Sequence, residues 1–243
     1  MTKTNHTEEK SESISDLKLK VHDFVEIEYT GRLEDNTLFD TTDENLAKSS
    51  GLTRQGNFGP VVICLGENHI LNSLDKAIQE KGISTFDIEL EPENAFGKKN
   101  AQLLKLLPMK VFLKEKINPF PGLEVNVDNM YGVVRSVSGG RVIVDFNHPL
   151  AGKRVKYHIK VNKKIDEPLE KAKAVLKNEF NFLPEMKIEN EILVIDEKIP
   201  DEVLNAIKER ILKLIPEIKD VSKKHSEAHN EKAIETTSEK KNN

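Results

Sequence analysis

Regular alternation of apolar and polar residues, found in three separate segments, is the feature that most constrains the fold of this chain. In FVEIEYT, Val25, Ile27 and Tyr29 fall on one face and two glutamates on the other. TFDIELE at 85–91 and RVKYHIKV at 154–161 repeat the pattern. A period of two is typical of a strand with one buried face, so each segment is expected to cover a core with its apolar side.

Two further segments complete this predicted layer. VVICL at 61–65 is an apolar run after glycines and a proline, as expected for a short strand that follows a loop. HILNSLDKAIQEKG at 69–82 has apolar residues at helical spacing, and Gly82 ends it. Its apolar face comprises Ile70, Leu71, Leu74, Ala77 and Ile78. Together these segments predict an α+β fold with an antiparallel sheet wrapped on one helix.

The stretch between Gly97 and His148 has a different character. GLEVNV, GVVRSV and RVIVDF are short strand patterns, and Ser138-Gly139-Gly140 between the last two favours a tight hairpin. Residues 103–116 are expected to form an irregular lead-in. We therefore predict a small β-rich module inserted into the larger sheet domain.

The pattern changes again after Ile165. Pro168 is expected to open a helix whose apolar face holds Leu169, Ala172, Leu176 and Leu183. KIENEILVID then predicts one strand, and 201–215 an amphipathic helix ended by Pro216. A small α/β unit at 166–218 has a thin core. It could pack on its own chain or on a second copy as a homodimer, and the sequence leaves both open.

Composition narrows the class of protein. Residues 1–18 and 219–243 are polar and are expected to be disordered. The net charge of −4 does not indicate a nucleic-acid binder, and no apolar run is long enough to span a bilayer. Cys64 is the only cysteine, so no internal disulfide is possible. We expect a soluble, cytoplasmic protein that binds neither nucleic acid nor membrane.

Four motifs in a fixed order connect the chain to a family. VEIEYTGRLEDNTLFDTT, VVICLGENHILNSLDKAI, PENAFGKK and NHPLAGKRVKYHIKV resemble segments of the FKBP-type peptidyl-prolyl isomerases. The layout is similar to the SlyD-like subgroup, most of all to its longer archaeal members. That resemblance implies an isomerase domain at 19–97 plus 148–165, an IF (insert-in-flap) chaperone domain at 98–147 and an additional C-terminal domain. For the last of these it rests on position and length only.

The resemblance also implies a shallow apolar pocket that binds a proline. The matching residues are Tyr29, Phe39, Asp40, Ile70, Leu71, Leu74, Phe96 and Tyr157. Three departures stand out. Phe96 replaces a common Tyr, Tyr157 a common Phe, and Asn72-Ser73 a common Pro-Gly, which is expected to loosen the start of the helix. Asp40 is expected to organise the rim and not to transfer protons.

The implied activity is peptidyl-prolyl cis-trans isomerisation, which needs no nucleophile, redox group, metal or other cofactor. No Cys or second His stands at ligand spacing from His148 or His158, so we expect no metal site. The resemblance implies that the insert binds unfolded or nascent polypeptides, through partly covered residues such as Tyr131, Val133 and Val134. The alternative is a non-catalytic holdase or partner-binding module on the same scaffold.

Overall fold

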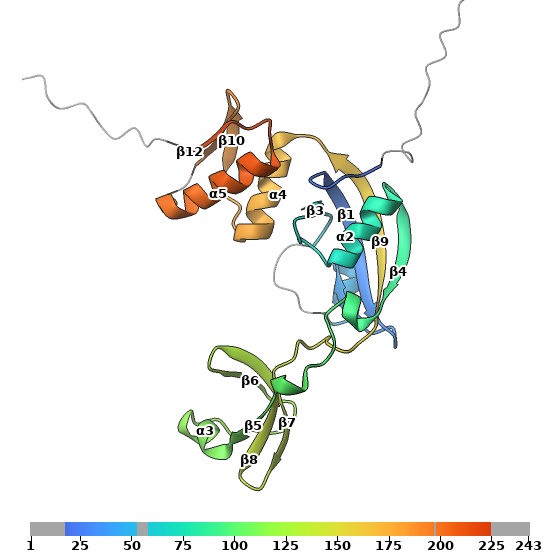
Figure 1. Ribbon diagram of the computed structural model, residues 1–243, viewed down its shortest axis with the longest axis vertical. Coiled ribbons are helices and arrows are strands. Elements are labelled where there is room, and N and C mark those ends of the chain that lie inside the picture. The colour runs from blue at the N-terminus through green and yellow to red at the C-terminus, as the bar shows by residue number, and fades with distance from the viewer. Residues whose placement is uncertain (1–17, 53–57, 197, 225–243) are drawn as a thin grey trace, which may run out of the picture. The chain divides into compact units, whose positions relative to one another are not determined.

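The computed structural model describes residues 18–52, 58–196 and 198–224 (Figure 1). They form a mixed α+β structure in two compact units, with the boundary between Ile165 and Asp166. Most of the expected N-terminal extension and residues 225–243 of the expected tail lie outside the described residues. None of the helices in the described ranges is long and apolar enough to cross a membrane.

The first unit is built around a five-stranded antiparallel sheet (Figure 1). The order is β2-β1-β9-β4, and β3 pairs with the first half of β1. The strands are β1 (Phe24–Leu33), β2 (Leu38–Thr41), β3 (Val61–Cys64), β4 (Thr85–Leu90) and β9 (Val155–Ile165). The alternating segments thus form β1, β4 and β9, which confirms the one-sided strands predicted from their period.

Helix α2 (Asn72–Lys81) packs on the buried face of this sheet, and Gly82 ends it with a φ of 66°. The helix begins at Asn72, because Leu71 has an extended backbone (φ −56°, ψ 134°). Ile70 and Leu71 therefore lie in the turn before the helix. A short helix α1 (Glu44–Ser49), capped by Asp43, and a 3-10 turn η2 (Pro92–Asn94) complete the domain.

The insert has its own sheet, with the order β5-β8-β7-β6. After a 3-10 turn η3 (Ala101–Leu103) its elements are β5 (Leu104–Pro108), α3 (Met109–Lys114), β6 (Glu124–Val127), β7 (Met130–Ser138) and β8 (Arg141–Asp145). Its core contains Phe112, Val125, Val134, Val142 and Val144. The prediction of an irregular segment at 103–116 is wrong, because β5 pairs with the distant β8 and Phe112 is 1% exposed.

The second unit contains α4 (Pro168–Phe180), β10 (Met186–Glu189), β11 (Ile192–Ile195), α5 (Asp201–Leu214) and β12 (Asp220–Lys223). Its sheet has the order β10-β11-β12, with an antiparallel hairpin followed by a parallel pair. Pro168 opens α4 as expected, and Ile207 and Ile211 of α5 are fully buried.

Three expectations for this unit are wrong. KIENEILVID forms a hairpin, because Asn190 and Glu191 adopt positive φ and turn the chain. Leu183 is 60% exposed, since α4 already ends at Asn181 in a left-handed cap. The tail is not disordered from residue 219, because β12 pairs with β11 and buries Val221.

Candidate active site

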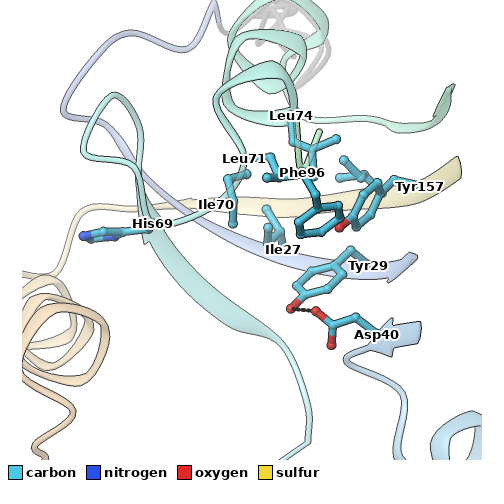
Figure 2. A pocket seen from close by; sticks show the side chains of 10 residues that line it. Ile27, Tyr29, Asp40, His69, Ile70, Leu71, Leu74, Phe96 and Tyr157 are labelled. Atoms are coloured by element: carbon cyan, nitrogen blue, oxygen red, sulfur yellow. Dashed lines mark hydrogen bonds between the residues drawn. The ribbon is translucent and has the colours of Figure 1, made fainter. Parts of the chain in front are cut away.

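A pocket of about 200 Å³ lies on the core side of the first unit, between β1, β9 and the start of α2. This volume is below the range typical of drug-sized ligands, so it suits a group the size of one amino-acid residue. Figure 2 shows the lining side chains, which are Ile27, Tyr29, Asp40, His69, Ile70, Leu71, Leu74, Phe96, Tyr157 and Ile159.

The turn between β3 and α2 supplies the aliphatic side of the pocket. Two side-chain bonds fix this turn: Asp75, 2% exposed, accepts a hydrogen bond from the Gly66 N–H at 2.8 Å, and Nδ1 of His69 accepts one from the Cys64 N–H at 3.0 Å. Ile70 and Leu71 follow directly, and Leu74 comes from the first turn of α2. The His69 ring points away from the aromatic side of the pocket (Figure 2).

Four aromatic rings from separate parts of the chain form the opposite side. The Phe39 ring stands edge-on to Phe96, with ring centres 5.9 Å apart, and edge-on to Tyr157 at 5.6 Å. Tyr29 is tilted against Tyr157 at 6.2 Å. Edge-to-face pairs are favoured over stacked sandwiches because ring edges are positive and ring faces negative. The cluster therefore gives the pocket a firm aromatic wall.

The polar side chains of the aromatic side are Tyr29, Asp40 and Tyr157, and His69 is the polar side chain of the aliphatic side. The Tyr29 hydroxyl donates a hydrogen bond to Oδ2 of Asp40 at 3.0 Å (Figure 2). Burial raises the pKa of Tyr157, and the charge of Asp40 and the neighbouring Tyr29 raise it further. The Tyr157 phenol thus stays protonated and can act as a hydrogen-bond donor.

Gly31 allows two of the rings to approach the backbone. A Cβ atom at this position would lie 2.6 Å from Cζ of Phe39 and 2.9 Å from Cε1 of Tyr157. Real Cβ atoms do not come this close to a carbon atom, so only glycine fits without moving the aromatic wall. The sequence around Gly31 did not indicate this close approach, because the approach depends on the pairing of β1 with β2 and β9.

The structure gathers the predicted pocket residues in one place. Seven of them line the pocket, and Phe39 packs against two of those seven. Their roles in catalysis stay predictions. Ile27, His69 and Ile159 line the pocket as well and were missed. Alternation could have indicated Ile27 and Ile159, which share a strand face with Tyr29 and Tyr157.

The insert exposes apolar side chains, but not the full set predicted. Tyr131 is 80% exposed and Val133 is half-buried. The expectation that Val134 is only partly covered is wrong, because it is 1% exposed and pairs with Val144 in the core. Exposed apolar residues that the sequence did not single out are Leu104, Leu106, Leu113, Phe120, Met130 and Ile143.

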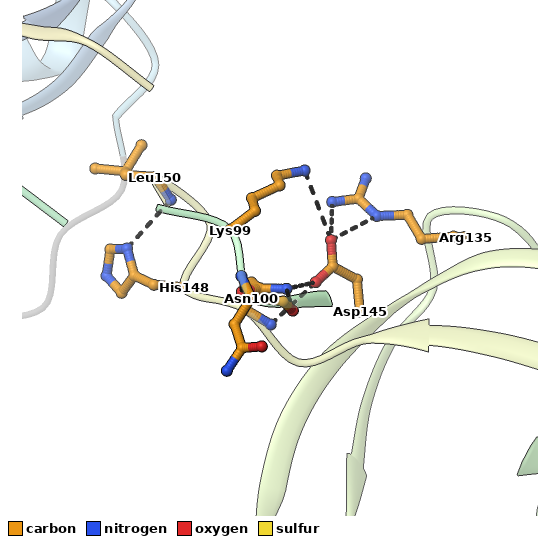
Figure 3. Close-up of polar contacts among 7 residues, drawn as sticks. Lys99, Asn100, Arg135, Asp145, His148 and Leu150 are labelled. Atoms are coloured by element: carbon orange, nitrogen blue, oxygen red, sulfur yellow. Dashed lines mark hydrogen bonds and ion pairs between the residues drawn. The ribbon is translucent and has the colours of Figure 1, made fainter. Parts of the chain in front are cut away.

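Two segments, 97–100 and 145–152, connect the insert to the pocket domain, and we call them the neck (Figure 3). Asp145, 3% exposed, is its central group. Its Oδ2 accepts hydrogen bonds from Arg135 at 2.8 and 3.1 Å, and its Oδ1 from the N–H and Nδ2 of Asn147. Lys99 lies 3.7 Å from Oδ2. Burial alone would raise the pKa of Asp145, but the Asn147 and Arg135 bonds outweigh it and lower the pKa to about 2.

No group of three or more His, Cys, Asp or Glu side chains within the described ranges could hold a metal ion. His158 lies on the exposed side of β9, where Nδ1 is 2.7 Å from Asp87.

Comparison with known proteins supports a relationship at two levels. The model of the family "FKBP26, IF domain" matches residues 105–150, which cover most of the insert. The short-type peptidyl-prolyl cis-trans isomerase of Methanocaldococcus jannaschii is 25% identical over 150 residues, covering 59% of this chain and 92% of that protein. SlyD of Helicobacter pylori, an FKBP-type peptidyl-prolyl cis-trans isomerase, is 29% identical over 140 residues, covering 56% and 69%.

Among solved structures, the three FKBP domains of wheat FKBP73 match with a TM-score of 0.33 and 15% identity, covering 61% of this chain and 40% of that one. The sequence matches are therefore the informative ones: the insert is similar to the IF domain of FKBP26, and the chain is similar to FKBP-type peptidyl-prolyl isomerases, SlyD among them.

Proposed function

We propose that this chain is a peptidyl-prolyl cis-trans isomerase that accelerates folding steps limited by proline. The observation that carries this proposal is the residue-sized pocket with an aromatic wall and few polar groups. Rotation about an X–Pro bond faces a barrier of about 20 kcal/mol, because the amide C–N bond has partial double-bond character. A protein lowers this barrier if it binds the twisted amide more tightly than the planar one.

The pocket offers groups for each part of such a substrate. Leu74 and Ile70 would contact the proline ring, and the Tyr29–Asp40 pair would fix the rim. A twisted amide loses resonance, so its carbonyl is less polar and fits beside the Phe96 ring. Because Phe96 lacks a hydroxyl, the protonated phenol of Tyr157 would donate a hydrogen bond to a substrate carbonyl.

We further propose that the insert binds unfolded chains by its exposed apolar residues. Tyr131, Leu106 and Leu113 are each more than half exposed, and large apolar side chains gathered on one small module favour an interaction site. A client bound there would reach the pocket in an intramolecular step, which raises its effective concentration. Proline-containing unfolded or nascent polypeptides are the expected partners.

A second candidate is a holdase without useful isomerase activity. The same exposed residues favour it, together with Phe96 in place of Tyr at the pocket wall. The cytoplasmic location, the long archaeal type and a homodimer through 166–218 also stay predictions.

Refolding of a test protein limited by a proline step, with catalytic amounts of this chain, tests the proposal. Phe39→Ala should abolish most of the acceleration, whereas the matched control Phe86→Ala, which removes an equal ring from the same core outside the pocket, should retain it. Tyr131→Glu should weaken client binding and leave turnover of a short proline peptide unchanged.

Suppressed aggregation of the client without any acceleration would reject the enzyme and support the holdase. Equal losses in Phe39→Ala and Phe86→Ala would show that core stability, and not the pocket, explains the effect.

A further inference from the structure

Phe96 stands at the point where the pocket domain passes into the neck. The chain leaves the domain directly after Phe96 and returns at 145–152. The two segments of the neck are bonded to each other. The Asn100 N–H donates to Oδ1 of Asn147 at 2.8 Å, Nδ2 of Asn147 donates to the Asn100 carbonyl at 3.1 Å, and the Gly152 N–H donates to the Gly97 carbonyl at 2.8 Å.

His148, on the returning segment, lies flat on the Phe96 ring. The ring centres are 4.7 Å apart and the ring planes differ by 1°. Nδ1 of His148 accepts a hydrogen bond from the Leu150 N–H at 3.1 Å, and the Ala151 N–H donates to the His148 carbonyl at 2.9 Å (Figure 3). The turn at 148–151 therefore sets the direction of the imidazole, and the imidazole in turn limits where the Phe96 ring can lie.

Ser73, which precedes Phe96 in the chain, holds the segment directly before Phe96. Its Oγ donates a hydrogen bond to the Asn94 carbonyl at 2.7 Å, which ties the first turn of α2 to η2. The Gly97 N–H closes the same turn by donating to the Pro92 carbonyl at 2.7 Å. The Ser73 bond is one that glycine could not make, and the expectation that Asn72-Ser73 loosens the start of the helix stays a prediction.

We propose that His148 and Ser73 are positioning residues that hold Phe96 at the pocket wall, and that the neck thereby controls how well the pocket turns over proline. This inference rests on the proposed isomerase function. His148 restrains the ring itself, and Ser73 restrains the backbone that carries it. Asp145 bonds to Arg135, Asn147 and Lys99, none of which lines the pocket, yet it fixes Asn147 directly beside His148.

The first experiment follows the Phe96 ring without using activity. The full chain is prepared with 4-fluorophenylalanine at position 96, and its ¹⁹F spectrum is recorded for His148→Ala, Ser73→Ala and Asp145→Asn. We expect each to shift or broaden the signal. His148→Phe keeps a flat ring at the stack and should restore most of the original signal. His158→Ala and Ser84→Ala are matched controls, since His158 pairs with Asp87 and Ser84 bonds at the far end of α2, and both should leave it unchanged.

The second experiment measures kcat and KM on a short proline peptide. A stacked pair or a single hydrogen bond supports losses of between about two- and tenfold in kcat/KM for His148→Ala and Ser73→Ala, with the fall mainly in kcat and a melting temperature close to that of the controls. Because both residues act on one ring, the double variant should lose less than the product of the single losses.

The two proposals fail in different ways. An unchanged ¹⁹F signal in His148→Ala and Ser73→Ala would overturn the positioning roles, whatever the activity. An unchanged signal in Asp145→Asn alone would overturn control by the neck. A wild-type chain that does not accelerate proline isomerisation would reject the isomerase function, and with it the link to turnover.

Discussion

Replacing Gly31 by Ala tests whether the aromatic wall makes the pocket. The added Cβ would meet Cζ and Cε2 of Phe39 at 2.6 and 2.9 Å and Cε1 of Tyr157 at 2.9 Å. The φ of Gly31 lies outside the left-handed region, so an alanine there suffers no backbone strain. The effect therefore comes from the two rings, which must move away from β1. Phe39 is half-buried and can yield, whereas Tyr157 is 5% exposed and has little room.

The expected cost follows from overpacking. Added atoms in a packed core destabilise a protein by about 1–3 kcal/mol, which for a unit of this size corresponds to a melting temperature lower by roughly 2–12 °C. Displacement of a wall by about 1 Å can cost up to about 100-fold in rate. We expect kcat/KM for a proline peptide to fall between about 10- and 100-fold at a temperature where the variant is fully folded.

Gly132 provides the matched control. A Cβ there would lie 2.6 Å from Cδ1 of Phe146, which lies in the neck and packs on the insert core, and 2.7 Å from Cγ1 of Val144 in that core. Gly132→Ala should therefore impair client capture and, because it leaves the Phe39 and Tyr157 rings untouched, should lower turnover of a short peptide less than Gly31→Ala does. Unaltered turnover and stability in Gly31→Ala, or identical activity profiles for the two variants, would refute this reading of the pocket.

Three other changes have definite expected results. Tyr157→Phe removes the protonated phenol but keeps the ring, so kcat/KM should fall about threefold or more without loss of melting temperature; an unchanged rate would exclude the phenol as a donor. Asp75→Ala leaves the Gly66 N–H without this acceptor, so the free energy of unfolding, measured with denaturant, should fall by about 1–3 kcal/mol. A fall smaller than the error of the fit would contradict this prediction. Because the pKa of Asp145 is lower in the folded chain than its unfolded value near 3.8, the ionised carboxylate adds up to about 2 kcal/mol to the free energy of unfolding at pH values above about 4. The difference in stability between the wild-type chain and Asp145→Asn, followed by hydrogen exchange of the insert, should vanish as the pH falls from about 4 to 2. A difference that does not change with pH would show that the bonds of Asp145 to Arg135 and Asn147 do not stabilise the insert.

The sheet and the pocket of the first unit could be predicted from the sequence because each strand there buries one face. Tyr29 and Tyr157 point inward for the same reason as Ile27 and Ile159, so a period of two locates them all. The helix was predictable from its spacing, although its first turn was not, because the extended backbone of Leu71 depends on its neighbours.

The insert was harder to predict, because its strands form by pairing with segments that lie far away in the sequence. Residues 104–108, LKLLP, alternate over three residues only, and they form a strand by pairing with β8. In GVVRSV either Val133 or Val134 could face the core, and a register shift after Val134 obscures the pattern. The exposed apolar residues were missed for a similar reason, since apolar side chains are expected to be covered.

In the second unit the missing signals were local. Turns between strands are usually marked by glycine, but Asn190 and Glu191 adopt the left-handed backbone without one. Val221 is the only apolar residue of β12, and it pairs with the parallel strand β11. One apolar residue gives no periodicity, so the sequence did not indicate this strand.

The position of β9 sets an order of events during synthesis. It is an interior strand of the pocket domain and pairs with both β1 and β4, for example Phe24 with Ile165, yet it follows the whole insert in the chain. A ribosome therefore delivers a complete insert before the host domain can close. The insert, with its more local contacts, can fold early. Until β9 has been synthesised, the growing chain contains both the insert, with its exposed apolar residues, and an unfinished sheet. The insert is then available to shield the apolar face of that sheet.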